Sequence, residues 1–303
     1  MKELPENQVT ENNPPSQQQI DTLLGHYQSN HFEEFEKLAR WMTEEFPAHQ
    51  IGWKALGVAL KKRGKVTESL APMRRSVDLA PRDAEAHHNF GITLQELGRL
   101  DEAEASHNQA IALKPGYAQA HNDLGATLQA AGRLTEAVAS YNQAITLEPD
   151  YAEAYSNLAI TLRQLGSVSE AIVACVRAVT IKPDFTTAYG HLGLVIKNVV
   201  FEEPNPSLYP IFIHLLATGN LVRPIDAASP ILSLLRHDPR IKDLLSRTKS
   251  IETFGAAVSA IDALDQFPLL HQLMRVCPLP DLQLEEMFAS IRRWLLIDLD
   301  EIK

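Results

Sequence analysis

The sequence of 303 residues has only two cysteines and no long apolar run. Cys175 and Cys277 form no CxxC motif and no disulfide-type spacing, which is typical of a reducing compartment, and we expect both to be small buried apolar side chains. A membrane-spanning helix needs roughly 20 consecutive apolar residues, and a signal peptide needs an apolar core near the N-terminus. Because neither pattern is present, we predict a cytoplasmic location and no membrane partner.

Positive charge is also scarce, because 28 lysines and arginines stand against 38 acidic residues and leave a formal net charge of -10. A protein that binds a nucleic-acid backbone needs a clustered basic face. We therefore expect no nucleic-acid partner. The hydrophobic content of 45% is nevertheless enough to bury a sizeable core.

Catalytic and metal-binding motifs are missing as well. The sequence contains no HExxH, P-loop, GxGxxG or GxSxG motif, so we predict no catalytic residue, no cofactor and no enzymatic activity. The neighbours His87 and His88 cannot ligate one ion together, because adjacent residues of a helix diverge by about 100°. We expect His87, His107 and His121 to be packing residues and predict no metal site.

The prolines reveal an internal repeat. Five of them are spaced 34 residues apart: Pro47, Pro81, Pro115, Pro149 and Pro183. Glycines recur in the same register, each followed three residues later by Thr, Asp or Ser: Gly64 and Thr67, Gly98 and Asp101, Gly132 and Thr135, Gly166 and Ser169. Glycine tolerates the left-handed conformation that ends a helix, and Ser, Thr or Asp can cap the next one. Each unit is therefore predicted to be a helix, a tight turn and a helix, with the third residue after glycine as the cap.

Apolar and small residues share this register. In the first helix they are Leu56, Phe90, Leu124 and Leu158, and in the second helix they are Ala103, Ala137 and Ala171. The eighth position of each unit is also small: Gly57, Gly91, Gly125 and Ala159. Small residues at fixed positions indicate that the two helices of a unit approach each other closely there.

The spacing Trp53-x-x-Leu56-Gly57-x-x-Leu60, the later alanines and the closing Pro81 resemble the tetratricopeptide repeat. The resemblance implies an all-α fold, a right-handed superhelix whose first helices line a concave groove. It places complete repeats at 50–83, 84–117, 118–151 and 152–185, a degenerate capping repeat at 18–49 and a half repeat at 186–200. Residues 1–17 are expected to form a disordered tail.

The 34-residue period stops after Glu202, and prolines separate shorter helical patterns, so residues 201–303 are predicted to form a nonrepeating helical domain. Segments 221–226, 233–239 and 273–280 resemble a helical region of bacterial fusions between tetratricopeptide repeats and a class I methyltransferase. In those fusions the catalytic domain lies downstream, and its Gly-rich motif is absent here. The chain ends inside a predicted amphipathic helix, Leu284 to Lys303, which leaves open that it is part of a longer protein.

Candidate ligand contacts follow from the groove that the resemblance implies. The sixth position of each unit reads Ala55, Asn89, Asp123, Asn157 and, in the half repeat, His191. In repeats that resemble those of O-GlcNAc transferase, asparagines at this position grip an extended peptide backbone, and Asn89 and Asn157 match them. Asp123 and His191 do not match, and an ionised aspartate offers only acceptors to a peptide.

Other positions of the first helices complete the candidate groove. They are Lys54, Val58, Lys61, His88, Ile92, Gln95, Asn122, Ala126, Gln129, Ser156, Ile160 and Arg163. The apolar row Val58, Ile92, Ala126, Ile160 and Leu194 favours an extended peptide with alternate apolar side chains. The carboxylate clamp of repeats that bind chaperone tails is missing, because Val58, Gln119 and Asp123 stand where the clamp needs asparagine and cations.

The sequence therefore predicts a protein-interaction scaffold that binds an extended peptide or a partner protein. One alternative is the substrate-targeting N-terminal half of a SAM-dependent methyltransferase whose catalytic domain lies beyond this chain. Another is an oligomerisation module in which the last helix pairs with its copy. We expect a monomer, with a homo-oligomer left open.

Overall fold

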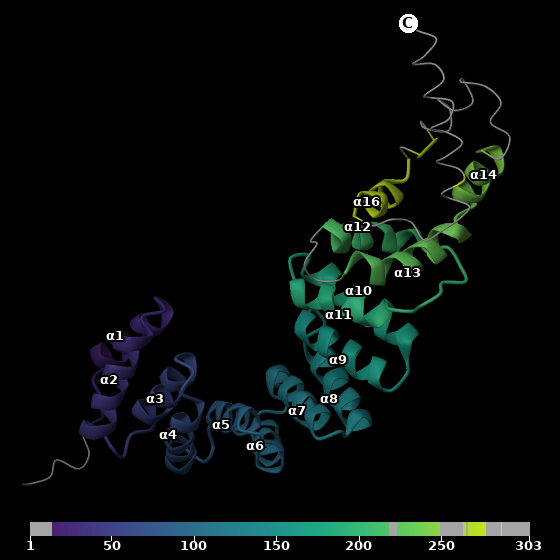
Figure 1. Cartoon of the computed structure of the whole chain (residues 1–303). Helices are drawn as coiled ribbons and strands as arrows, with labels where there is room; N and C mark the ends of the chain where they lie inside the picture. Colours follow the sequence, from purple (N-terminus) through teal and green to yellow (C-terminus); the bar gives the residue numbers. More distant parts are fainter. Residues whose placement is uncertain (1–13, 218–222, 249–262, 265, 277–285, 287–303) are drawn as a thin grey trace, which may run out of the picture. The chain divides into compact units, whose positions relative to one another are not determined.

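The computed structural model describes residues 14–217, 223–248, 263–264, 266–276 and 286 (Figure 1). Residues 1–13 of the predicted tail 1–17, Cys277 and all of the expected C-terminal helix except Glu286 lie outside the described residues. Within that predicted tail, Ser16 caps the first helix, which begins at Gln17. The chain divides into two compact units, Met1–Pro149 and Asp150–Lys303. The described residues contain helices and no strand, so the predicted all-α class is confirmed.

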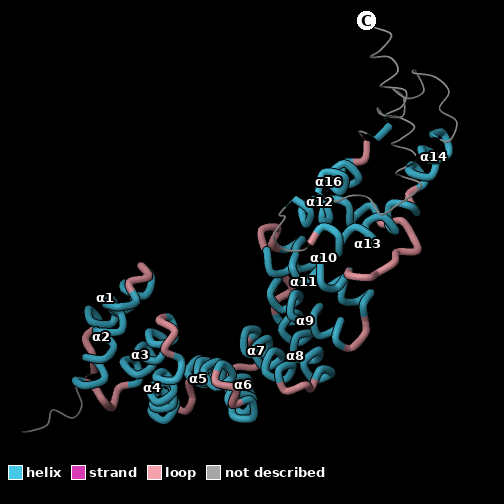
Figure 2. The backbone as a smooth tube through the Cα atoms, viewed as in Figure 1, coloured by secondary structure: helices cyan, strands magenta, loops and turns pink. Residues whose placement is uncertain are grey.

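The first unit consists of helices joined by short loops (Figure 2). They are α1 (Gln17–Gln28), α2 (Phe32–Glu45), α3 (Gln50–Lys62), α4 (Val66–Leu79), α5 (Ala84–Glu96), α6 (Leu100–Leu113), α7 (Ala118–Ala130) and α8 (Leu134–Leu147). Odd-numbered helices are the first helices of the repeat and even-numbered helices are the second, and each helix packs against the next.

The second unit continues this pattern and then departs from it. Its helices are α9 (Ala152–Gln164), α10 (Val168–Ile181), α11 (Thr186–Ile196), the 3-10 helix η1 (Pro206–Leu208), α12 (Tyr209–Ala217), α13 (Pro224–His237), α14 (Pro239–Thr248) and α16 (Pro268–Val276). In the described part of the chain no helix is long and apolar enough to cross a membrane.

The helix lengths and the proline positions agree with the predicted unit. From α3 to α10, first helices have 13 residues and second helices have 14. The second helices α4, α6, α8 and α10 end at Leu79, Leu113, Leu147 and Ile181, two residues before a repeat proline. The prediction that proline follows each second helix is therefore confirmed.

The turn inside each unit is built on a left-handed glycine, as predicted, with φ of 76° at Gly64 and 73° at Gly98. The predicted helix cap, however, is wrong. Helix α4 begins at Val66, so Thr67 is its second residue, and the true cap position is held by Lys65, whose side chain makes no capping hydrogen bond. The other units have the same geometry. Because the glycine reverses the chain within residues 63–65, the next helix starts two residues earlier than the capping pattern implies.

Close approach of the two helices of a unit is confirmed by the space around the eighth-position glycines. A Cβ atom added to Gly91 would lie 2.7 Å from the ring of His107, and one added to Gly125 would lie 2.7 Å from the ring of Tyr141. A Cβ on Gly57 would lie 2.8 Å from the Met73 side chain. These pairs lie on the first and second helix of the same unit, so the glycine makes room for a large partner.

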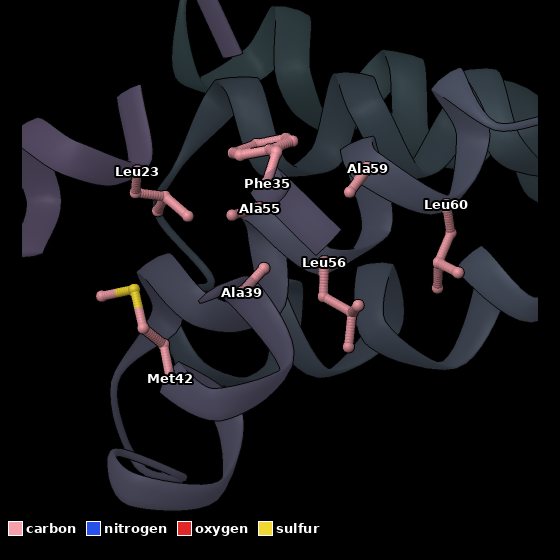
Figure 3. Close-up of a cluster of buried hydrophobic side chains, with 8 residues drawn as sticks. All are labelled: Leu23, Phe35, Ala39, Met42, Ala55, Leu56, Ala59 and Leu60. Atoms are coloured by element: carbon pink, nitrogen blue, oxygen red, sulfur yellow. The ribbon is translucent and has the colours of Figure 1, made fainter. Parts of the chain in front are cut away.

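The core of the first unit begins with a cluster of buried side chains from α1, α2 and α3 (Figure 3). Its members are Leu23, Phe35, Ala39, Met42, Ala55, Leu56, Ala59 and Leu60. Phe35 stands where the repeats from residue 84 onward have alanine, and the Tyr27 ring lies against it with 5.4 Å between the ring centroids. The larger side chain therefore fills space between α1 and α2 in the repeat predicted to be degenerate.

Rings at the fourth position of the units that begin at residues 50, 84 and 118 contact the preceding turn. Trp53 Nε1 lies 2.9 Å from the carbonyl oxygen of Pro47, and His87 Nε2 lies 3.1 Å from that of Pro81. His121 makes the same contact with Pro115 at 3.2 Å. These rings anchor the start of a first helix to the repeat proline, which explains histidine here without a metal.

In the second unit, nonrepeating helices pack on the half repeat, as expected. The Tyr189 ring of α11 lies 4.5 Å from the His214 ring of α12, centroid to centroid, and α11 also packs against α13. Leu192 and Ile196 are fully buried, whereas Leu194 is 51% exposed. Helix α11 packs against α9 and α10 as well as against α13, and Leu194 stays open.

Candidate functional site

A cleft of about 640 Å³ lies in the first unit, on the side formed by the first helices α1, α3 and α5. It is lined by Leu23, Leu24, Tyr27, Phe35, Ile51, Lys54, Ala55, Val58, Lys61, Lys62, Met73, Glu85, Asn89, Ile92 and Glu96. Five of the predicted groove residues meet here: Lys54, Val58, Lys61, Asn89 and Ile92. Its size is within the range of about 300 to 1,000 Å³ that is typical of ligand sites.

The wall of the cleft follows the 34-residue register. Leu24, Val58 and Ile92 are successive members of one row, on α1, α3 and α5. Sequence reasoning missed Leu24 and Tyr27, which are 47% and 39% exposed. Both could have been found, because they lie 34 residues before Val58 and Lys61. Counting back into the degenerate repeat extends the predicted apolar row by one residue.

Two lysines of the cleft are held in ion pairs that join α3 to α5. Lys54 Nζ lies 3.1 Å from Asp83 Oδ2 and 2.6 Å from Glu85 Oε2, and Lys61 Nζ lies 3.0 Å from Glu96 Oε1. Burial alone would raise the pKa of Asp83, but a hydrogen bond from Gln50 and the charge of Lys54 bring that pKa below its ordinary value. The lysines are therefore neutralised within the protein.

Asn89 is a polar side chain of the cleft whose amide is not used in a hydrogen bond within the described residues. It is half-buried on α5, beside Ile92. In the described part of the chain its side chain makes no hydrogen bond, so its donor and its acceptor are both available to a ligand in the cleft.

Three other predicted groove residues form a buried network outside the cleft. His88 Nε2 lies 2.8 Å from Asp123 Oδ2, and the Tyr117 hydroxyl lies 3.1 Å from His88 Nδ1. The Asn122 amide donates to the other Asp123 oxygen at 2.9 Å. His88 and Asn122 are buried. This network joins α5 to α7, so Asp123, which does not match the asparagine pattern, serves packing between repeats.

The second unit contains a related contact. Ser156 is buried on α9, and its hydroxyl lies 2.8 Å from His191 Nδ1 on α11. Burial lowers the pKa of His191, although the nearby backbone carbonyl of Ser156 favours the charged ring. In both networks a fifth-position residue meets the sixth-position residue of the next unit, 35 positions later.

The remaining predicted residues lie on half-buried or exposed surface. Ala126, Asn157 and Ile160 are half-buried, and Arg163 is exposed. None of them lines the cleft of the first unit. Among the described residues no group of three His, Cys, Asp or Glu side chains could hold a metal ion.

Comparison with known families finds repeats in three segments. Models described as tetratricopeptide repeat match residues 73–105 and 152–185, and a model described as TPR repeat matches residues 128–166. No curated protein matches the chain in a sequence comparison.

Solved structures with a similar fold include two kinds of repeat protein. A double mutant of MamA from strain RS-1 has a TM-score of 0.50 at 14% identity, covering 55% of this chain and 93% of its own. YrrB, whose structure is described as a tetratricopeptide-repeat protein with an unusual peptide-binding site, has a TM-score of 0.48 at 17% identity, with coverages of 57% and 90%. At such identities the MamA match concerns the fold alone. The matched segments and the paired helices together establish that this chain carries tetratricopeptide repeats.

Proposed function

We propose that this chain is a protein-interaction scaffold and that an extended segment of its partner occupies the cleft of the first unit. The observation that carries the proposal is the row Leu24, Val58 and Ile92, aligned by the repeat, with the uncommitted amide of Asn89 beside it. Apolar pockets hold alternate side chains of an extended peptide, and an amide can both donate to and accept from its backbone.

The other predicted groove residues fall into two groups in this proposal, one that supports the cleft and one that offers further contacts. His88, Asn122 and Asp123 fix α5 against α7 and so hold the wall on which Asn89 stands. The rest offer secondary contacts on exposed or half-buried surface: Ala126, Asn157, Ile160, Arg163 and His191, with Ser156 positioning His191.

The proposal assigns no catalytic step and no cofactor to this chain. Cys175, a possible nucleophile by residue type, is fully buried, and burial raises the pKa of its thiol to about 12. A buried thiol of this kind is inert at neutral pH. Binding is therefore the activity that we propose.

The test uses peptides that the full chain selects from a random eight-residue peptide library. We expect Asn89→Ala to weaken the selected peptides by about 10-fold, the loss of roughly one to two hydrogen bonds. Asn108→Ala is the matched control, because Asn108 is exposed on α6 and does not line the cleft. Equal affinity of both variants and the unaltered chain would overturn the proposal.

A further inference from the structure

The charges of the cleft restrict what it can bind, and this step rests on the proposed function. Lys54 and Lys61 each face a carboxylate of α5 within 3.1 Å, and their side chains are largely buried. An acidic segment would have to displace Glu85 or Glu96 from these lysines and approach the carboxylates that it displaces. Lys62 also lines the cleft, but it is exposed, and a solvated lysine contributes little to an ion pair.

The surface between the ion pairs is apolar. Val58 and Ile92 lie between the Lys54 pair and the Lys61 pair along α3 and α5, and Leu24 extends the row onto α1. Leu24 and Tyr27 are among the large apolar side chains most exposed in the described residues. Burial of such side chains against an apolar partner is favourable, whereas burial of an unpaired charge there is costly.

We infer that the cleft takes an uncharged segment of a partner protein, anchored by a bulky aliphatic or aromatic side chain on the row Leu24, Val58 and Ile92. The ion pairs at the two ends of the row disfavour acidic segments. Each lysine is already paired with a glutamate of the protein, and these glutamates are exposed to solvent. Repulsion from these glutamates therefore excludes an acidic tail. The Asn89 amide forms hydrogen bonds with the backbone of the uncharged segment.

Two variants of equal charge separate this inference from a general charge effect. Glu96→Gln removes the carboxylate that pairs with Lys61 in the described residues. Glu85→Gln makes the same change in net charge, but Lys54 keeps Asp83 at 3.1 Å. Both glutamates are exposed, so neither change should unfold the protein, and circular dichroism of both variants checks this.

The experiment measures affinity for a library-selected peptide and for the same peptide with its apolar anchor replaced by aspartate. For the unaltered chain we expect the aspartate peptide to bind at least about 10-fold more weakly. Glu96→Gln should raise the affinity for the aspartate peptide by about 5-fold, whereas Glu85→Gln should leave that affinity unchanged.

Three results would overturn the inference. One is selection of acidic peptides by the unaltered chain. Another is equal recovery by the two variants. The third is a concentration-dependent dimer, measured by sedimentation, whose dissociation accompanies peptide binding, because the occupant would then be a second copy. In the first two cases only this inference fails, provided that Asn89→Ala still weakens binding of the selected peptides. The proposed function fails if Asn89→Ala has no effect on that binding.

Discussion

His107 is fully buried on α6, and neither of its ring nitrogens has a hydrogen-bond partner. The same register holds Met73 one repeat earlier and Tyr141 one repeat later. A buried polar group without a partner costs about 1 to 3 kcal/mol. We therefore predict that His107→Met raises the free energy of unfolding by about 1 to 2 kcal/mol in urea titrations. A lower stability than that of the unaltered chain would show that the imidazole packs better than methionine.

The same residue predicts a pH dependence. Burial lowers the pKa of His107 to about 4, with Asp123 opposing the shift and His88 and Lys61 adding to it. The unfolded chain therefore binds the proton more readily, so stability is fully present above the unfolded pKa near 6.5 and is lost as pH falls toward 4. The loss at His107 is on the order of 3 kcal/mol.

Carboxylates titrate in part of this window, so the measurement is a difference. Unfolding free energies of the unaltered chain and of His107→Met are compared between pH 7 and pH 4.5. The stability gained by the substitution should grow as pH falls. A gain that does not change with pH would contradict the assignment to His107.

At the scale of helices, the glycine positions decide how closely a pair can pack. We predict that Gly125→Ala lowers the free energy of unfolding by about 1 to 3 kcal/mol, because the new Cβ would lie 2.7 Å from the Tyr141 ring. Gly116→Ala is the control, since a Cβ there meets no atom within 4 Å. Thermal melting of both variants checks the prediction, and equal melting temperatures would refute it.

A second contact between elements centres on Glu36 of α2. Its buried carboxylate receives hydrogen bonds from Arg40, Arg63 and Lys65, and so ties α2 to the turn between α3 and α4. Burial would raise the pKa of Glu36, but these three cations together lower it below its ordinary value. The carboxylate therefore stays charged in the folded protein.

We predict that Glu36→Ala costs about 1 to 3 kcal/mol of stability, because it leaves three cations without their shared partner. Glu33→Ala on the same helix removes only an exposed pair with Lys37 and should cost less than about 0.5 kcal/mol. Denaturant titrations compare the two variants. Similar losses would mean that Glu36 contributes no more than a surface charge.

The helix pairs were predictable because their determinants repeat in the sequence. Prolines, glycines and small residues at a 34-residue spacing specify where helices end and where they approach. The ion pairs of Lys54 and Lys61 were not predictable, since their partners lie 29 to 35 positions away and depend on how one repeat packs on the next. Burial of His88, Asn122 and Ser156 was missed for the same reason. Sequence period identifies the face of a helix, and packing between repeats decides which part of that face stays open.

At the scale of the whole molecule, we expect the nonrepeating helices to stabilise the end of the repeats. Leu192 and Ile196 of α11 are fully buried, and Phe201 N–H donates to the Ser233 hydroxyl of α13 at 2.9 Å. We predict that truncation after Val200 exposes the face of α11 and lowers the melting temperature or the solubility. A truncated chain that stays monomeric and melts at the same temperature would show that α12, α13, α14 and α16 belong to an independent domain.

The central claim is that the partner segment lies on α1, α3 and α5 of the first unit. It is tested most directly by replacing Leu24 with the photoreactive residue benzoylphenylalanine in the full chain and irradiating it with a library-selected peptide. Leu24 is exposed in the cleft, and Val173, equally apolar and 61% exposed on α10, is the control position. The account predicts a covalent adduct from position 24 and none from position 173. An adduct from position 173 alone would contradict it.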